Sequence, residues 1–197
     1  MEKNILSYLS KEEKKLLRVA SFKKNEIIFN EGEICNSIAI LIEGRVEIIS
    51  YSFSGKEVIF NIVEKNQIFG NNLLFSSDPT YKGNVMAVVK STIVFISKEN
   101  LISLLSSNES FLKEYLKIQS DFGKHLNAQI KLFSIDSALE RFKYYLFLNK
   151  GEINYKSITS LANELNLKRE TLSRLISRLE KENVIQRSLH HISLISR

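Results

Sequence analysis

Three residues near the end of the chain combine charge and spacing in a way that suits the recognition of DNA bases. Arg169, Glu170 and Arg174 lie at positions i, i+1 and i+5 of the stretch RETLSRLISRLEKEN, whose apolar residues recur at helical spacing. An arginine can donate two hydrogen bonds to O6 and N7 of guanine, and a glutamate can accept one from N4 of cytosine. The alternative is a solvated amphipathic face on which Glu170 and Arg174 pair at i, i+4.

The surrounding pattern predicts a helix-turn-helix that would position these side chains. Ser157 can cap the first helix and donate to a phosphate, and Ala162 supplies the small residue that close helix packing needs. Asn166 occupies the turn, because asparagine tolerates the left-handed conformation better than most residues. The second helix begins near Lys168, and its apolar Leu172, Leu175, Ile176 and Leu179 face inward. The remaining buried positions are Leu161, Leu165 and Leu167, and further candidate DNA contacts are Lys168, Ser173 and Arg178.

A longer apolar stripe predicts a helix over residues 108–133. Such a helix needs a partner along its stripe, either its own β domain or the same helix of a second subunit, and we favour the second. The residues expected in this dimer seam are Phe111, Tyr115, Ile118, Phe122 and Leu126. A shorter helix is expected over 137–151, closed by Gly151.

The first half of the chain is rich in short β-type runs. After a polar, helix-like start, strands are expected at 27–29, 37–44, 45–50, 57–63 and 91–97. Glycines fall between or beside these runs at intervals of 11 to 15 residues, which indicates regular turns. This pattern favours a β-sandwich or barrel.

Composition restricts the class of protein further. Hydrophobic residues make up 44% and charged residues 25% of the 197 residues, as in a soluble globular protein of one or two domains. The formal net charge is +6, and residues 134–197 hold 11 Lys/Arg against 7 Asp/Glu, which suits a polyanionic partner. We expect a cytoplasmic protein, since the sequence has no membrane-length apolar run and no signal peptide. Cys35 is the one cysteine, so no disulfide forms within a chain and a small buried thiol is expected.

The segment RETLSRLISRLEKENVI resembles the recognition helix of the CRP/FNR family, whose pattern is R-E-T-x-x-R. EGEICNSIAILIEGRVEI resembles the family's early β-roll segment, and IFGNNLLF resembles its phosphate-binding segment. The resemblance implies an α+β fold with three parts. These are an N-terminal double-stranded β-helix (jelly-roll, cyclic-nucleotide-binding-like) domain at 1–107, a dimerisation helix and hinge at 108–136, and a C-terminal winged helix-turn-helix at 137–197.

The same resemblance implies a transcription regulator, not an enzyme, that binds palindromic promoter DNA as a homodimer. Arg169, Glu170 and Arg174 would read bases, Ser157 would contact backbone phosphate, and residues 184–195 would form the wing. RNA polymerase is an expected further partner if the protein is an activator.

The family's known sensors are missing here. Members that bind cyclic AMP hold its phosphate with a glutamate after the F-G pair and an arginine in the next loop, where this chain has Asn71 and the pair Tyr81 and Lys82. Cyclic AMP is therefore not expected, and neither is a metal or another cofactor, because residues 1–124 hold no histidine and one cysteine. An unidentified effector would bind near Gly70, Asn71, Tyr81 and Lys82, although an effector-free regulator fits the sequence equally well.

Two other classes of protein compete with this interpretation. A cupin-like metalloenzyme shares the β-roll but generally needs two or three histidines with a carboxylate. A small-molecule-binding module could use its C-terminal part for protein contacts instead of DNA.

Overall fold

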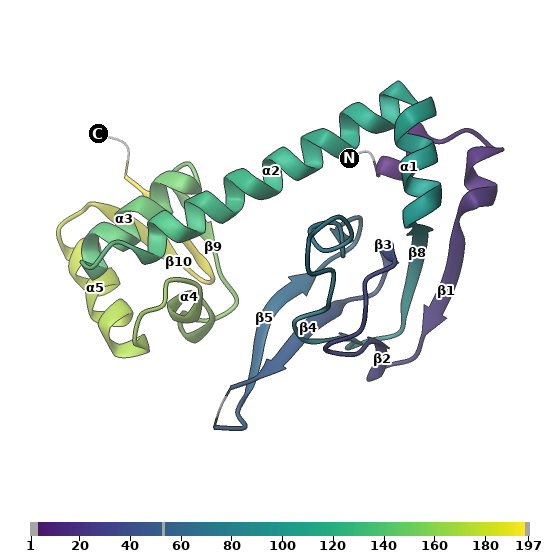
Figure 1. Ribbon diagram of the computed structural model, residues 1–197. Coiled ribbons are helices and arrows are strands. Elements are labelled where there is room, and N and C mark those ends of the chain that lie inside the picture. The colour runs from purple at the N-terminus through teal and green to yellow at the C-terminus, as the bar shows by residue number, and fades with distance from the viewer. Residues whose placement is uncertain (1–3, 53, 196–197) are drawn as a thin grey trace. The chain divides into compact units, whose positions relative to one another are not determined.

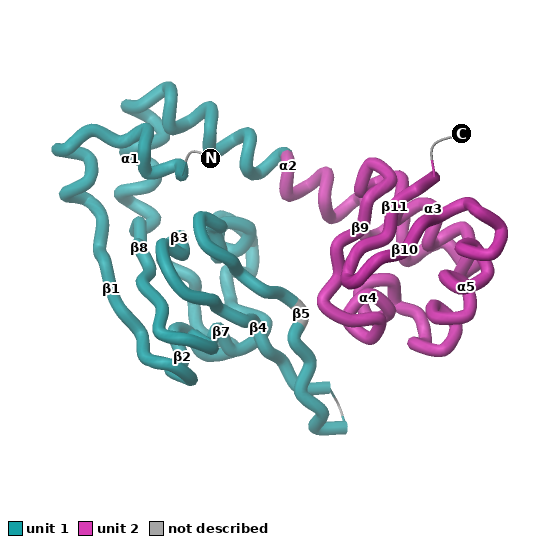
Figure 2. Tube along the Cα trace, turned by 180° about the vertical axis from the view of Figure 1, so that it is seen from behind, with its two compact units in different colours: residues 1–120 teal, residues 121–197 magenta. Residues whose placement is uncertain are grey.

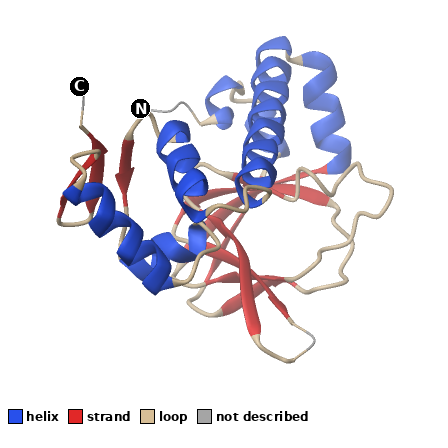
Figure 3. Cartoon of the chain, turned by 90° about the vertical axis from the view of Figure 1, so that its left-hand side faces the viewer, coloured by secondary structure: helices blue, strands red, loops and turns tan. Residues whose placement is uncertain are grey.

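The computed structural model describes residues 4–52 and 54–195, and the chain in it divides into two compact units, residues 1–120 and 121–197 (Figure 2). The helices are α1 (Lys98–Ser107), α2 (Glu109–Phe133), α3 (Ala138–Leu148), α4 (Ile158–Glu164) and α5 (Arg169–Lys181), shown in Figure 1. The strands are β1 (Arg18–Phe22), β2 (Glu26–Phe29), β3 (Ser37–Glu43), β4 (Val46–Tyr51), β5 (Glu57–Val63), β6 (Ile68–Phe69), β7 (Asn84–Ala87), β8 (Ser91–Ser97), β9 (Glu152–Asn154), β10 (Ile185–Ser188) and β11 (His191–Leu194). Strands and helices, red and blue in Figure 3, occur in both units by their residue ranges, so the α+β class expected from the sequence is confirmed.

Unit 1 contains two four-stranded sheets in which every pair of neighbouring strands is antiparallel. Their strand orders are β1-β8-β3-β6 and β2-β7-β4-β5. Except for the hairpin of β4 and β5, consecutive strands fall in different sheets, and the chain winds as a β-roll. Gly44 makes the turn between β3 and β4 with a φ of 101°, and a Cβ there would lie 2.2 Å from Ser91 Oγ. The close approach therefore demands glycine at this position.

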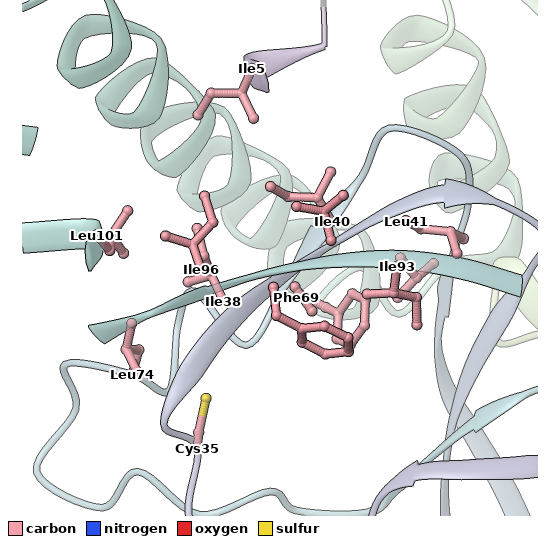
Figure 4. Packing of buried hydrophobic residues seen from close by; sticks show 14 of the residues in the cluster. Ile5, Cys35, Ile38, Ile40, Leu41, Phe69, Leu74, Ile93, Ile96 and Leu101 are labelled. Atoms are coloured by element: carbon pink, nitrogen blue, oxygen red, sulfur yellow. The ribbon is translucent and has the colours of Figure 1, made fainter. Parts of the chain in front are cut away.

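The core of unit 1 lies where the sheets meet the helices that follow them. Figure 4 shows Ile40 and Ile96 on the side of the strands that faces the helices, and Phe69 on the opposite side. Leu101 and Leu104 of α1 and Phe111 of α2 complete this core, each with no more than 1% of its surface exposed. Helices α1 and the first half of α2 thus belong to the packing of the β-roll.

Unit 2 is a small helical domain with a three-stranded sheet, β10-β11-β9. Helices α3, α4 and α5 share one core, which also includes Leu132 from the last turn of α2. Strands β10 and β11 form an antiparallel hairpin that pairs Ile185 with Leu194, as expected for the wing. In the part of the chain that the structure describes, no helix is long and apolar enough to cross a membrane.

Most of the expected strands and helices are present, and five regions differ from the prediction. The start is not an ordinary helix: it holds two short 3-10 helices, Ile5–Tyr8 and Glu13–Leu16, and is followed by β1. Strands β6, β7 and β9 and helix α1 were not expected either. Short elements of this kind owe their stability to tertiary packing and leave little periodic signal in the sequence.

The structure also corrects part of the expected dimer seam. Phe111 and Tyr115 are 0% and 5% exposed and pack into the core of their own β-roll, and Ile118 packs against that core. The other partner considered for the stripe, the β domain of the same chain, therefore accounts for the first half of α2. The apolar side chains of the stripe become exposed only in the second half of the helix, where Phe122 is partly buried and Leu126 is 45% exposed.

Candidate nucleic-acid interface

The helix-turn-helix of unit 2 is built by local interactions that the sequence encodes. Ser157 and Ser160 form a capping box at the start of α4: Ser157 Oγ accepts a hydrogen bond from the backbone N–H of Ser160 at 3.0 Å, and Ser160 Oγ accepts one from that of Ser157. Asn166 takes the left-handed conformation with a φ of 48°, and the N–H of Leu167 then donates to the carbonyl of Ala162 at 2.8 Å. The expected cap and turn residues are confirmed.

Helix α5 buries one face and exposes the other. Leu172, Leu175, Ile176 and Leu179 are 0–8% exposed and pack against α3 and α4, as the periodicity predicts. Arg169, Glu170 and Arg174 are exposed on the other face, and Lys168 is the N-cap residue of the helix. All four thus lie in its N-terminal half.

The base-reading candidates are not engaged with one another. Among the described residues no ion pair includes Arg169, Glu170 or Arg174, so the Glu170–Arg174 pair of the alternative interpretation is not formed. Arg178 does pair, with Glu182 at 3.6 Å. The hydrogen-bonding groups of Arg169, Glu170 and Arg174 are accordingly available to a ligand.

Two hollows flank the cationic side chains of α5. One, of about 330 Å³, is lined by Ser173, Arg174, Ser177, Arg178 and Lys181. The other, of about 400 Å³, lies between α5 and the start of α3 and is lined by Ser137, Ala138, Leu139, Thr171, Arg174, Leu175 and Arg178. Ser177 and Lys181 were not among the contacts expected from the sequence. Ser177 follows Ser173 at i+4 and Lys181 follows Ser177 at i+4, and this spacing is the signal that places them on the same face as Ser173.

A side-chain hydrogen bond also joins α3 to α4. The hydroxyl of Tyr145 on α3 donates to Glu164 at the end of α4 at 2.7 Å. Burial, together with this bond to a carboxylate, raises the pKa of Tyr145, so the phenol stays protonated and remains a donor. The bond fixes α4, and hence the turn before α5, against α3.

Of the four residues expected at an effector site, Gly70, Asn71 and Tyr81 are buried and Lys82 is exposed. Tyr81 is 3% exposed, stacks on Phe29 with ring centroids 4.5 Å apart, and places its hydroxyl 3.3 Å from where a Cβ of Gly70 would lie. Asn71, 8% exposed, donates from its side-chain amide to Gln119 on α2 at 2.8 Å. Lys82 is exposed and pairs with Asp78, so its charge is engaged within the loop.

Cys35 is also buried in the β-roll, 2% exposed, with its sulfur 3.3 Å from the carbonyl of Ser37, so the small buried thiol expected there is confirmed. Within the described residues, no three His, Cys, Asp or Glu side chains gather to hold a metal ion.

Comparison with known proteins finds relatives of the β-roll in sequence and of the whole fold in structure. Residues 19–108 match the model of the cyclic nucleotide-binding domain family. A curated relative, the Anaerobic regulatory protein of Bacillus subtilis, is 24% identical over 109 residues, which are 55% of this chain and 46% of that protein. The match thus spans about half the length of this relative.

Two solved structures illustrate the likeness in three dimensions. A mutant of CooA from Carboxydothermus hydrogenoformans superposes with a TM-score of 0.70 at 19% identity and covers 98% of this chain and 92% of its own. A transcriptional regulator from Thermotoga maritima has a TM-score of 0.57 at 25% identity, over 64% of this chain and 98% of its own. The first covers both units, and the fold of the whole chain is thereby matched.

Proposed function

We propose that this chain is a transcription regulator of the CRP/FNR family that binds double-stranded DNA as a homodimer and reads inverted-repeat promoter sites with α5. The observation that carries the proposal is the two-sided character of α5, whose apolar face is buried while Arg169, Glu170 and Arg174 are exposed and make no ion pair among the described residues. A helix of this kind fits the major groove, which is wide enough to admit it.

Base reading is the role proposed for Arg169, Glu170 and Arg174, and backbone contact is the role proposed for Lys168, Ser173 and Arg178. The hollows beside Arg174 and Arg178 leave these side chains room to adjust to a phosphate or a base edge. Ser157 already uses its hydroxyl oxygen as a cap acceptor, but the hydroxyl hydrogen can still be donated to a phosphate.

Dimerisation is proposed through the second half of α2. Leu126 and Ile130 are 45% and 64% exposed and continue the apolar stripe from the partly buried Phe122. Two such helices, packed about a twofold axis, would cover these side chains and present two α5 helices to successive major grooves about 34 Å apart. The predicted seam thus moves toward the C-terminal end of α2 relative to the sequence-based expectation.

Control by an effector is proposed only at the turn after β6, near Gly70, Asn71 and Tyr81, and cyclic AMP is not the expected ligand. If the protein activates transcription, RNA polymerase is its further partner. Effector binding and contact with RNA polymerase would both take place in the cytoplasm, where the promoter DNA is.

Selection of bound fragments from genomic DNA, followed by footprinting of the purified chain, tests this function. We expect protection of an inverted repeat by two chains, with affinity that falls steeply as salt rises because phosphate contacts release counterions. Binding that does not distinguish the selected fragments from random DNA would contradict sequence-specific regulation. A chain that binds no DNA would instead favour a module for small molecules or proteins.

A further inference from the structure

Among the buried residues that the structure describes, Arg141 alone carries a full charge. It is the fourth residue of α3 and is 9% exposed. Its guanidinium donates to three backbone carbonyls: Nε and Nη2 to Ile135 at 2.9 and 2.6 Å, and Nη1 to Leu165 and Asn166 at 3.1 and 2.9 Å. The charge is thus held by peptide dipoles.

A buried guanidinium is costly unless its N–H groups are satisfied, so this arrangement calls for an explanation. No ion pair among the described residues includes Arg141, and the carbonyls that it contacts lie in segments that no strand hydrogen bond fixes. An arginine does here what an apolar side chain cannot, because its rigid planar fork holds several acceptors in one fixed geometry.

The two segments that Arg141 joins have distinct roles. Ile135 is the second residue after α2, whose last turn is anchored in the same core by the fully buried Leu132. Leu165 and Asn166 form the turn between α4 and α5. Arg141 therefore connects the end of the proposed dimer helix to the turn from which the recognition helix starts, entirely within unit 2.

We propose that Arg141 is a positioning residue that fixes α5 relative to the second half of α2 and thereby sets the half-site spacing that the dimer accepts. This inference rests on the proposed function, since spacing has meaning only for a dimer that binds DNA. In such a dimer the distance and rotation between the two α5 helices follow from how each is held against its own α2. If this connection were lost, each α5 would stay folded, but the distance between the two α5 helices of the dimer would no longer be fixed.

The test compares inverted repeats whose central spacer is lengthened or shortened by one and two base pairs, together with a DNA that carries a single half-site. We expect the wild-type dimer to prefer one spacer by about tenfold or more, because each added base pair moves and rotates one half-site relative to the other. Arg141→Lys keeps the charge but has all its donors on one nitrogen, so it cannot reproduce the planar fork that reaches the three carbonyls. Arg141→Met keeps the volume but removes the charge. For each variant, the affinities for inverted repeats of different spacer length should lie within about threefold of one another. The affinity of each variant for the single half-site should stay within about twofold of the wild-type value.

The matched control is Arg45→Lys. This substitution makes the same chemical change in unit 1, where Arg45 pairs with Glu47, far along the chain from the helix-turn-helix. It should keep the wild-type spacer preference. A purely structural role for Arg141 would lower affinity for all DNAs in parallel and leave the preference intact, and that result would overturn the inference. So would a failure of both Arg141 variants to fold, judged by near-ultraviolet circular dichroism, since Arg141 would then hold the domain and not the spacing. If wild type itself shows no inverted-repeat preference, the proposed function fails first.

Discussion

The side-chain amide of Asn71 donates a hydrogen bond of 2.8 Å to the side-chain carbonyl of Gln119, which joins the turn after β6 to α2. Asn71 stands where the resemblance to cyclic-AMP-binding members would require a glutamate. The side-chain amide of Asn71 is therefore bonded to α2 of the same chain, and it supplies no charge for a ligand.

We expect neither cyclic AMP nor cyclic GMP to bind with micromolar affinity. Tyr81 stacks on Phe29 inside the roll, and Lys82 pairs with Asp78, so neither offers the bidentate cation that a cyclic phosphate needs. Isothermal titration calorimetry of the full chain should show no saturable heat at nucleotide concentrations up to about 100 μM. Saturable micromolar binding would mean that these side chains rearrange around a ligand.

Leu126→Glu is expected to convert the dimer into monomers, because it places a carboxylate in the proposed seam of α2. Light scattering should then report one chain where wild type reports two. Phe147→Glu is the control, since Phe147 is an apolar residue of α3, 74% exposed and outside the stripe, and this variant should stay dimeric. A wild-type monomer at micromolar concentration would refute the dimer.

Phe111→Ala should act on folding, in contrast to Leu126→Glu. Phe111 is fully buried in the core of the β-roll, and truncation of a buried phenylalanine typically costs about 3–5 kcal/mol of the free energy of unfolding. Urea denaturation monitored by circular dichroism measures this loss. A variant of unchanged stability that dissociates into monomers would restore Phe111 to the dimer seam.

The difference between these two positions shows what the sequence could and could not predict. The spacing of Phe111, Tyr115, Ile118, Phe122 and Leu126 predicts one helix with one apolar face, and α2 has both. Periodicity does not say what covers such a face, because the β-roll of the same chain and a second copy of the helix offer equivalent apolar surfaces. The change of environment along α2 is therefore visible only in the folded chain.

The winged domain was easier to predict because its signals are local. Ser157 as cap, Asn166 in the left-handed turn and the apolar face of α5 each follow from a residue's own conformational or periodic preference. Arg141 left no such signal: an arginine in the first turns of an amphipathic helix is ordinarily solvated, and its burial depends on carbonyls up to 25 residues away in sequence. The β1 strand was missed for the same reason, since RVASF pairs with β8, more than 60 residues later.

The Glu13 carboxylate should titrate at a lower pH than an ordinary glutamate. The backbone N–H of Ser10 at 2.7 Å and the side-chain amide of Asn108 at 2.9 Å donate to it and hold the pKa of Glu13 below its usual value. A depressed folded-state pKa contributes stability that is present above the unfolded-state pKa and is lost as the pH falls through the folded-state value. Carbon-13 NMR of the Glu13 carboxyl gives the titration directly.

The variant Asn108→Ala tests the cause, because it removes one donor and should raise the pKa of Glu13 toward that of a free side chain. Asn108 also accepts from the N–H of Phe111 as the cap of α2, so some loss of thermal stability should accompany the shift. An unchanged Glu13 titration in this variant would assign the depression to Ser10 alone.

The last prediction separates base reading from phosphate contact on α5. Arg174→Ala should cost about 1–3 kcal/mol per half-site and relax the preference at one base pair, where we expect a guanine, while affinity for random DNA stays nearly unchanged. Lys168→Ala is the matched control, since Lys168 is also exposed, stands at the N-terminus of the same helix without a capping hydrogen bond from its side chain, and is expected to meet a phosphate. Its loss should weaken specific and random DNA alike and lower the salt dependence of binding by about one counterion per half-site. Gel-shift titrations of both variants at several salt concentrations, on the selected site and on its single-base substitutions, measure all of these quantities. If Arg174→Ala weakened binding to every sequence equally, Arg174 would hold the DNA backbone, and the specificity of α5 would have to come from Arg169 and Glu170.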